Sequence, residues 1–491
     1  MKKITNILFI FFISLTTNSY LLSISIAAGC EYTLLLDENG IVWSCGIGKR
    51  GALGHGDTKE QLLPKEIHSI PKIVSVAAGY CHTVLLDENG IVWSCGPSNN
   101  SALGHGNTKE QLLPKEIPSI PKIVSVAAGG HTLFLDENGI VWSCGNGYYG
   151  QLGHGNKEQR LLPKKIAGIP KIVLVAAGFN HTLLLDENGI VWAFGGGWNG
   201  QLGHGNTEKL RPKKINNIPK IIAVAAGHSH TLLLDEEGNV WSCGYGCYGA
   251  LGHGNIEEQL RPKQIANIPK IIAVAASTYH TLLLDEEGNV WSCGKGGNGQ
   301  LGHGNTGDQL RPKQIANIPK IIAVVASTYH TLLLDEEGNV WSCGKGGNGQ
   351  LGPGNTGEQL LPKRIADIPK IIAMAAGSYH TLLLDENGIV WSFGNGYYGQ
   401  LGHGDTKNQL LPKQIAGIPK IIAVATGFYK TLLLDINGIA WSCGYGENGA
   451  LGHADKANKV VPTKIEGIPL IAIPKKRFKN TKNARNWDDE R

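Results

Sequence analysis

Histidine offers the clearest chemical potential in this sequence, because two sets of histidines recur at intervals of about fifty residues. Imidazole is a common metal ligand and a common general acid or base. The first set lies in Leu-Gly-His-Gly or a close variant: His55, His105, His154, His204, His253, His303, His403 and His453. The second set directly precedes threonine: His82, His131, His181, His230, His280, His330 and His380. A ring of such groups is a pattern that a metal site would use.

Two observations argue against that chemistry. Tyr32, Pro353 and Lys430 replace histidine in otherwise intact copies of the two motifs. Equivalent positions in successive copies of a repeated unit also lie one whole unit apart, which is too far for a single ion with bonds of ~2.0 Å to nitrogen. We therefore expect the histidines to stabilise each unit by hydrogen bonding a turn, and we predict no metal site.

The cysteines follow the same logic. Seven of the ten occupy one slot after Trp-Ser, and Phe194 and Phe393 fill that slot in two other copies. A slot that accepts phenylalanine is apolar, and a free cysteine packs there as a small hydrophobe. Equivalent slots should lie too far apart for the Cα separation of ~5.5 Å typical of a disulfide. Two pairs, Cys243 with Cys247 and Cys30 with Cys81, remain open as disulfides.

No other reactive constellation stands out from the repeated background. We find no pair of nucleophile and base and no carboxylate dyad. The string Gly-Tyr-Gly-Cys-Tyr-Gly is unlike a phosphate-binding loop, because no Lys-Ser or Lys-Thr follows it. The sequence predicts a protein without a cofactor that is not an enzyme.

Nine copies of one unit carry these residues. The tryptophan of Val-Trp-Ser-Cys-Gly and its variants recurs every 49 or 50 residues, at Trp43, Trp93, Trp142, Trp192, Trp241, Trp291, Trp341, Trp391 and Trp441. Internal repeats of this length are typical of solenoids and propellers. We expect these tryptophans to be structural and to pack between neighbouring units.

Each unit reads as a small antiparallel sheet of four strands. Lys72–Ala78 is a short apolar run that we expect to form an inner strand buried on both faces. His181–Leu185 and Ile190–Gly195 flank an Asn-Gly pair, which is a strong hairpin signal. Pro163 lacks a backbone donor, so its segment should be the outermost strand. Because one such sheet cannot bury both faces, we predict an all-β propeller of about nine units.

The charge is gathered at the two ends of the chain. The formal net charge is +5, but the last eighteen residues, 474–491, hold seven cations and only three acids, and Lys2 and Lys3 lie at the start. The body between them is close to neutral, which gives no electrostatic footprint for nucleic acid. We expect residues 474–491 to be a disordered basic tail.

The first nineteen residues have the pattern of a secretory signal. Met1-Lys2-Lys3 is followed by the apolar run Ile4–Leu15, which is too short for a membrane span. We therefore expect a signal peptide at 1–19, repeats over 20–473 and an exported mature chain without a membrane span. Ala27-Ala28-Gly29-Cys30 also matches a lipid-attachment box, although Ala-Ala-Gly recurs in later copies, so lipidation at Cys30 stays an alternative.

Three motifs recur together: Ala-Ala-Gly-x-x-His-Thr, Asp-Glu-Asn-Gly-Ile-Val-Trp, and Tyr-Gly-Gln-Leu-Gly-His-Gly. In this combination the chain resembles the regulator of chromosome condensation repeat family over Ser23–Ile473. The resemblance implies a propeller, with seven blades as the family norm. Family members include a guanine-nucleotide exchange factor, a plant photoreceptor, secreted β-lactamase inhibitors and bacterial effectors. The scaffold is what they share, and a fold does not fix a function.

The chain departs from that family pattern in two ways. Nine units exceed seven blades, so either the ring is larger or surplus units lie outside it. Every period is 49 or 50 residues, which leaves no room for an insertion like the β-wedge with which the exchange factor contacts its GTPase.

The copies differ most in the loop after Trp-x-x-Gly, which is rich in glycine and aromatic residues. As a hypothesis, these aromatics bind a protein partner, since exposed aromatics anchor interfaces: Tyr148, Tyr149, Trp198, Tyr248, Tyr397 and Tyr398. The alternative is ordinary loop drift. The residues before His-Thr vary as well, as in Thr278-Tyr279 and Ser378-Tyr379.

The function we predict from the sequence is therefore a secreted, non-enzymatic protein-interaction scaffold, with a host-directed effector as one form of it. The alternatives are an exchange factor for a small GTPase and a propeller that inhibits an enzyme. The partner is expected to be a protein, either a small GTPase or a host protein.

Overall fold

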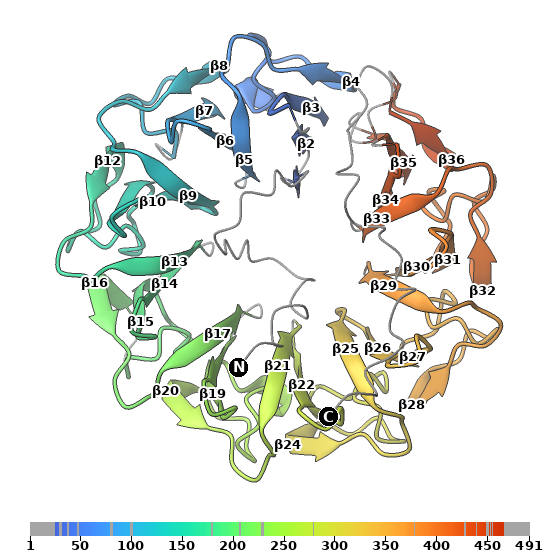
Figure 1. The fold of residues 1–491 in the computed structure, drawn as a ribbon. Helices are drawn as coiled ribbons and strands as arrows, with labels where there is room; N and C mark the ends of the chain where they lie inside the picture. The colour runs from blue at the N-terminus through green and yellow to red at the C-terminus, as the bar shows by residue number, and fades with distance from the viewer. Residues whose placement is uncertain are drawn as a thin grey trace, which may run out of the picture.

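The chain folds into one ring of nine four-stranded sheets in a computed structural model (Figure 1). The structure describes residues 25–28, 32–36, 39–46, 49–78, 82–98, 102–177, 180–205, 208–226, 230–277, 279–377, 379–426, 429–437, 439–447, 451, 453 and 455–465. We number the sheets as blades 1 to 9 in chain order, from β1–β4 to β33–β36. The expected signal peptide, Cys30, Cys81 and the basic tail all lie outside the described residues.

Each blade is an antiparallel meander of four consecutive strands. The inner strands are β1 Ser25–Ala28, β5 Ile73–Ala78, β9 Ile123–Ala128, β13 Ile172–Ala177, β17 Ile221–Ala226, β21 Ile271–Ala276, β25 Ile321–Ala326, β29 Ile371–Ala376 and β33 Ile421–Thr426. The second strands are β2 Tyr32–Leu36, β6 Thr83–Asp87, β10 His131–Asp136, β14 His181–Asp186, β18 His230–Asp235, β22 His280–Asp285, β26 His330–Asp335, β30 His380–Asp385 and β34 Lys430–Asp435.

The third strands carry the repeated tryptophans and the outer strands carry the prolines. The third strands are β3 Val42–Gly46, β7 Val92–Gly96, β11 Val141–Gly145, β15 Val191–Gly196, β19 Val240–Gly244, β23 Val290–Gly294, β27 Val340–Gly344, β31 Val390–Gly394 and β35 Ala440–Gly444. The outer strands are β4 Gln61–Glu66, β8 Gln111–Glu116, β12 Arg160–Lys165, β16 Glu208–Lys214, β20 Gln259–Gln264, β24 Gln309–Gln314, β28 Gln359–Arg364, β32 Gln409–Gln414 and β36 Lys459–Lys464. The short 3₁₀ turns η1 Lys49–Gly51 and η2 Cys247–Gly249 precede outer strands.

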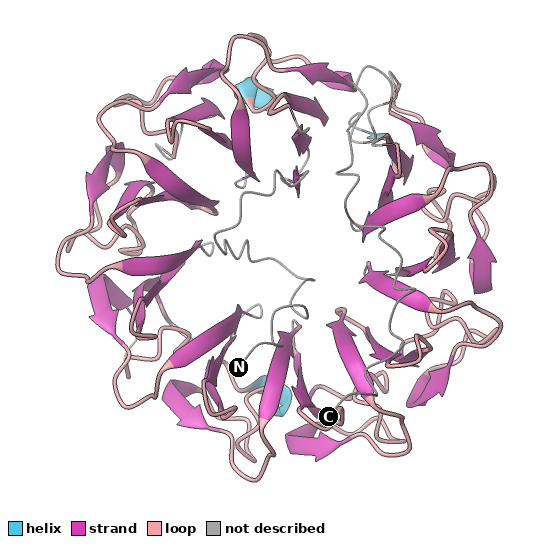
Figure 2. Cartoon of the chain, viewed as in Figure 1, coloured by secondary structure: helices cyan, strands magenta, loops and turns pink. Residues whose placement is uncertain are grey.

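The predicted propeller and the edge position of Pro163 in β12 are confirmed. Figure 2 shows strands radiating from the centre with loops at the rim and almost no helix. All nine units lie in the ring, so no surplus unit sits outside it. Within the described ranges, no helix is long and apolar enough to span a membrane.

The inner strand is less buried than we expected. In β9 only Ile123 is fully buried, and Val124 is 46% exposed, because the inner strands face the central opening. The strand that is buried on both faces is the second one: all six residues of β10 are buried. Its uninterrupted apolar run lies between two strands of its own sheet and the sheets of both neighbouring blades.

The hydrophobic core is divided among the junctions between blades. At the junction of blades 6 and 7, Leu284, Val290 and Ile315 of one sheet pack against Ile321 and Leu333 of the next. The tryptophan of each later blade covers this cluster, as Trp341 does here. The tryptophans of blades 2 to 9 thus pack at the junctions, in agreement with the expectation, whereas no described cluster includes Trp43. No blade has a complete core of its own.

Backbone hydrogen bonds also join the blades. Ile321 N of blade 7 donates to Gly288 O of blade 6 at 2.8 Å, and the same bond recurs at all eight junctions from blade 1 to blade 9. Gly304 N donates across the same junction to Leu360 O at 2.8 Å. Gly304 has φ of +82°, which explains the glycine in the Leu-Gly-His-Gly motif.

At the closing junction between blade 9 and blade 1, the described residues show contacts between side chains. Lys456 of blade 9 forms an ion pair with Glu60 of blade 1. Burial raises the pKa of Cys45 in β3, and the nearby charge of Lys430, which replaces a histidine in β34, offsets part of that rise. Every sheet contains strands from one repeat only, so no strand is exchanged to close the ring.

A buried aspartate holds the hairpin between the second and third strands. In blade 6, Asp285 Oδ1 accepts hydrogen bonds from Glu287 N at 3.1 Å and Asn289 N at 2.8 Å. Its Oδ2 accepts from Trp291 Nε1 at 3.0 Å. The same tryptophan-to-aspartate bond occurs in blades 2 to 9 at 2.9–3.2 Å. The carboxylate thereby ties the turn to the third strand.

Replacing Asp285 with alanine is expected to lower the free energy of unfolding by about 3 kcal/mol, because two backbone N–H groups and the indole N–H of Trp291 lose a charged acceptor. Urea unfolding followed by tryptophan fluorescence measures the loss. Asp285→Asn keeps one acceptor oxygen and should lose less. Glu287→Gln changes an exposed neighbour and should have almost no effect. A loss below 1 kcal/mol for Asp285→Ala would show that the turn does not depend on this carboxylate.

Candidate partner-binding face

One face of the ring carries the loops that vary among the blades. In a four-stranded meander, the loop between strands one and two and the loop between strands three and four emerge at the same end of the sheet. We call this end the loop face. The residues before His-Thr lie in the first of these loops, and the aromatic sequences after Trp-x-x-Gly lie in the second. The structure therefore brings both variable segments to one side of the propeller.

The six predicted aromatics fall into three separate groups on this face. The first group joins blades 3 and 4. Tyr149 lies between Tyr148, at 4.9 Å between ring centroids, and Trp198, at 4.6 Å, and both contacts are edge-on. Tyr148 is 64% exposed and Trp198 is 50% exposed. Tyr149 is half-buried and supports them both.

The second group lies between blades 5 and 6. Tyr248 in η2 meets Tyr279 of the next blade at 5.7 Å. Lys295 Nζ lies 4.9 Å from the centroid of Tyr248 and 5.3 Å from that of Tyr279. A cation at this distance over an aromatic ring is attracted by its negative face. This group therefore combines exposed aromatic surface with a positive charge.

The third group is the largest and spans blades 7, 8 and 9. We call it the tyrosine cluster, and it consists of Tyr329, Tyr379, Tyr397, Tyr398, Tyr429 and Tyr445. Tyr398 is at its centre, with Tyr397, Tyr429 and Tyr445 at 4.8–4.9 Å. Tyr379 stacks between Tyr329 at 5.8 Å and Tyr429 at 6.0 Å. Three consecutive blades thus contribute to one continuous aromatic surface.

Local hydrogen bonds hold the loops of the cluster. Gln400 Oε1 accepts from Tyr398 N at 2.9 Å, and Asn395 Oδ1 accepts from Tyr397 N at 3.2 Å. The same pair of bonds recurs in blade 3, at Tyr149 with Gln151 and at Tyr148 with Asn146. The conformation places the second tyrosine against the sheet and the first in solvent: Tyr397 is 67% exposed. The two loops therefore share one backbone conformation, held by the same two kinds of side chain.

Charge adds to the chemistry of the cluster at its two ends. Lys345 Nζ lies 5.1 Å from the ring centroid of Tyr329. The hydroxyl of Tyr445 donates to Glu447, and that hydrogen bond raises the pKa of Tyr445 above its usual value. Burial, with a smaller contribution from Tyr329, raises the pKa of Tyr379. Tyr379 and Tyr445 are therefore neutral hydrogen-bonding groups at physiological pH.

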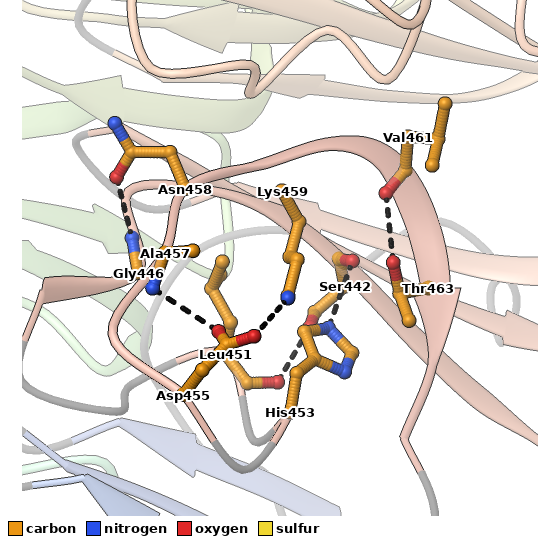
Figure 3. Close-up of polar contacts among 10 residues, drawn as sticks. All are labelled: Ser442, Gly446, Leu451, His453, Asp455, Ala457, Asn458, Lys459, Val461 and Thr463. Atoms are coloured by element: carbon orange, nitrogen blue, oxygen red, sulfur yellow. Dashed lines mark hydrogen bonds and ion pairs between the residues drawn. The ribbon is translucent and has the colours of Figure 1, made fainter.

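The histidines of the first set serve the blades. In blade 9, Ser442 Oγ donates to Leu451 O at 2.6 Å, and His453 Nε2 lies 2.7 Å from the same hydroxyl (Figure 3). Because the hydroxyl proton is already used, the imidazole N–H is the donor in the second bond. Nearby, Lys459 bonds to Asp455 at 2.5 Å and lowers the pKa of that carboxyl. The expected structural role of these histidines is confirmed.

The histidines of the second set act between blades, which the sequence did not reveal. His131 Nε2 of blade 3 lies 2.7 Å from Thr182 Oγ1 of blade 4, whose own proton goes to Gln151 O. The equivalent contact to the next threonine recurs at 2.9–3.4 Å for His82, His230, His280, His330 and His380. Burial lowers the pKa of His131 to about 3. These imidazoles are neutral donors inside the junctions.

The cysteines behave as the apolar slot predicts. Cys293 is fully buried, and burial raises its pKa to about 12, so it is an unreactive thiol. Cys243 and Cys247 are both free, so that candidate disulfide is not formed here, and Cys30 with Cys81 lies outside the described residues.

Over the described part of the chain, no three metal-binding side chains come together.

The loop face contains more aromatics than the six we predicted. Tyr279, Tyr329, Tyr379, Tyr429 and Tyr445 join them, and four of these precede the histidine or Lys430 at the start of a second strand. A signal was visible in the sequence. That position is tyrosine in blades 6 to 9 but Cys81, Gly130, Asn180 and Ser229 in blades 2 to 5.

Comparison with known proteins agrees with the fold. A family model described as RCC1-like domain matches residues 14–221 and 213–482. The structure of yeast RCC1 (Prp20) bound to Kap60 is 24% identical and covers 87% of this chain and 94% of its own, with a TM-score of 0.50. Prp20p from Saccharomyces cerevisiae is 27% identical over 70% of this chain and 90% of its own, with a TM-score of 0.46.

Human WBSCR16 is 26% identical over 70% of this chain and 99% of its own, with a TM-score of 0.47. No curated protein sequence matches the chain. The likeness to yeast RCC1 concerns the propeller fold.

Proposed function

Because the chain belongs to the RCC1-like domain family, we propose that it is a non-enzymatic scaffold that binds a protein partner through its loop face. The tyrosine cluster of blades 7 to 9 carries this proposal. Its six rings form one surface from three blades, and Tyr397 presents two thirds of its side chain to solvent. Tyrosine on ordered loops is the residue that binding surfaces use as an anchor.

The features of the loops support binding over catalysis. The repeated histidines, which could act as acids, bases or metal ligands, form hydrogen bonds within the blades or across their junctions, and the repeated cysteines are buried. The aromatic loops are held by glutamine and asparagine side chains, so little conformational freedom is lost when a partner binds. A rigid, aromatic and weakly charged surface suits a folded protein partner.

Exchange activity toward a small GTPase and inhibition of an enzyme remain the other functions open to this fold. No loop of the described chain is long enough to act as an inserted wedge, because each blade has four strands and a period of 49 or 50 residues. An inhibitor would use the same loop face to block an active site. The identity of the captured partner distinguishes these functions.

We also propose that the protein is exported, and that a host cell is one destination. The support is the sequence pattern of residues 1–19, a short basic start followed by an apolar run. Expression with and without residues 1–19, followed by mass spectrometry of the secreted chain, tests export. A chain that stays in the cytoplasm in both forms contradicts it.

Affinity capture with the full-length protein as bait, followed by mass spectrometry, tests the scaffold proposal. A matched bait carries Tyr397→Gly and Tyr398→Asn, which gives blade 8 the loop residues of blades 6 and 7. A true partner is retained by the native bait and lost from the matched one. A nucleotide-release assay on a panel of small GTPases is carried out in parallel. Accelerated release would contradict the scaffold proposal and show that the protein is an exchange factor.

A further inference from the structure

We propose that the outer rim of blades 3 to 7 is a second binding site, which takes a linear sulfated polysaccharide. This site is independent of the loop face. It lies on the outer strands β12, β16, β20, β24 and β28, which are neighbours around the ring (Figure 1). We call these five strands the basic arc.

The strands of the arc differ from those of blades 1 and 2 in their last residue. The last residue of the outer strand is Glu66 in β4 and Glu116 in β8, and it balances the lysine beside it. In the arc the same position is Lys165, Lys214 or Arg364, or a neutral glutamine. The five strands of the arc therefore carry many cations, and Glu208 is the acidic residue among them.

Three arginines mark the centre of the arc. Arg211, Arg261 and Arg311 are exposed, and each extends across the junction to a glycine of the preceding blade. An ideal Cβ placed on Gly155, Gly205 or Gly254 would lie 2.5–2.7 Å from the Nε atom of its arginine. The guanidinium groups thus lie between blades and join the charges of one strand to those of the next.

Packing does not require arginine at this position. In the other blades Leu113, Leu162, Leu361 and Leu411 lie over the equivalent glycines. Protection of an edge strand does not require it either, because a proline and a lysine already interrupt each strand of the arc. The arginines add charge beyond both structural needs.

The cations of the arc are available to a ligand. Each strand has an exposed lysine after its proline: Lys164, Lys213, Lys263, Lys313 and Lys363. Among the side chains that the structure describes, neither these lysines nor the three arginines take part in an ion pair. In contrast, the lysines near the opposite face are paired, as Lys270 is with Glu286 at 3.1 Å.

The shape and chemistry of the arc favour a flexible sulfated chain. The rim is convex, so a flat membrane touches only part of it, and a stiff duplex resists bending around it. Its five strands contain no aromatic residue on which a nucleic-acid base could stack. Arginine also replaces the most exposed leucine of the strand, which removes the apolar anchor that an acidic peptide would use. Guanidinium groups bind tetrahedral oxyanions in a bidentate geometry.

The test compares binding of the full-length protein to immobilised heparin over a range of NaCl concentrations. The variant Arg211→Leu/Arg261→Leu/Arg311→Leu installs the residue that other blades carry, so the fold is kept. We expect binding at least about ten-fold weaker at 0.15 M NaCl, with a salt slope smaller by about two, because three contacts that release counterions are lost.

The control Lys65→Gln/Lys115→Gln/Lys413→Gln removes the same charge from blades 1, 2 and 8, and it should bind within about two-fold of the native protein. Equal losses in both variants, or no loss in the arginine variant, overturn the site. Single-stranded DNA and polyglutamate of matched length should bind at least about ten-fold more weakly than heparin. Equal binding of either polymer overturns the sulfated-polysaccharide assignment. The basic tail is present throughout, so its contribution cancels.

Discussion

Acidification from pH 7 to pH 5 is expected to unfold the ring. Burial lowers the pKa of the seven histidines of the second set from 6.5 to about 4, and to about 3 for His131 and His330. The unfolded chain therefore binds protons in this range and the folded ring does not. Their contribution to stability is fully present above pH 6.5 and is lost as the pH falls toward 4.

The hydrogen bonds of these histidines explain why the folded state binds a second proton on the imidazole so weakly. Nε2 of each bonded imidazole already donates to a threonine, so an added proton would go to Nδ1. In His131, His280, His330 and His380 the Nδ1 atom is buried and has no hydrogen-bond partner among the described atoms. Protonation there would create a buried, unsatisfied and charged donor.

The expected loss is large because a histidine of the second set lies in seven of the nine blades. Seven sites with an unfolded pKa of 6.5 together lose about 7 kcal/mol between pH 6.5 and pH 5.5. That is comparable with the stability of a typical domain, about 5–15 kcal/mol. Urea unfolding at a series of pH values measures it. His280→Gln/His330→Gln retains a donor without titrating, so its stability should fall less steeply with acid. An identical pH dependence in that variant would show that other groups cause the loss.

The loop variant Tyr397→Gly/Tyr398→Asn is expected to weaken binding of the captured partner at least about 100-fold, in the range of interface hot spots. Tyr397 is the most exposed ring of the tyrosine cluster, and Tyr398 contacts three other rings. Blades 6 and 7 carry Gly-Asn at these two positions and form the same turn. The variant should therefore fold normally, which near-ultraviolet circular dichroism checks.

The first aromatic group provides the matched comparison. Tyr148→Gly/Tyr149→Asn makes the same change in blade 3, on the same face but outside the cluster. We expect a loss below about ten-fold, measured by the same titration. If this variant loses binding and the blade 8 variant does not, the binding surface is the group of Tyr148, Tyr149 and Trp198. If neither loses binding, the loop face is not the interface.

The sequence was sufficient to predict the strands within a blade but not the contacts between neighbouring blades. The Asn-Gly pair, the tryptophan period and Pro163 predicted the hairpin and the outer strand within one or two residues, because these signals act inside one sheet. The prediction that the inner strand is buried on both faces was wrong, because hydrophobicity alone does not tell which strand faces a neighbouring sheet. The second histidine set could not be assigned for the same reason, because its partner lies in the next blade.

The candidate site was predictable in part. The aromatic loops after Trp-x-x-Gly were recognised from their composition, and the structure places all six residues on one face. Their division into three groups depends on which blades touch. Tyr329 and Tyr429 were missed because each is a single residue beside a histidine motif, and only the packing shows that they extend a cluster.

The closure of the ring without a shared strand also affects how its genes can change. The boundary between copies in the sequence coincides with the boundary between blades, so an in-frame recombination between any two copies adds or removes one whole blade. Arg261–Leu310 and Arg311–Leu360 differ at only three positions, Ala275/Val325, His303/Pro353 and Asp308/Glu358, which is the record of such an event. Ring size in this lineage is therefore open to change by single genetic steps. Populations of related genes are expected to differ in blade number before they differ in blade design.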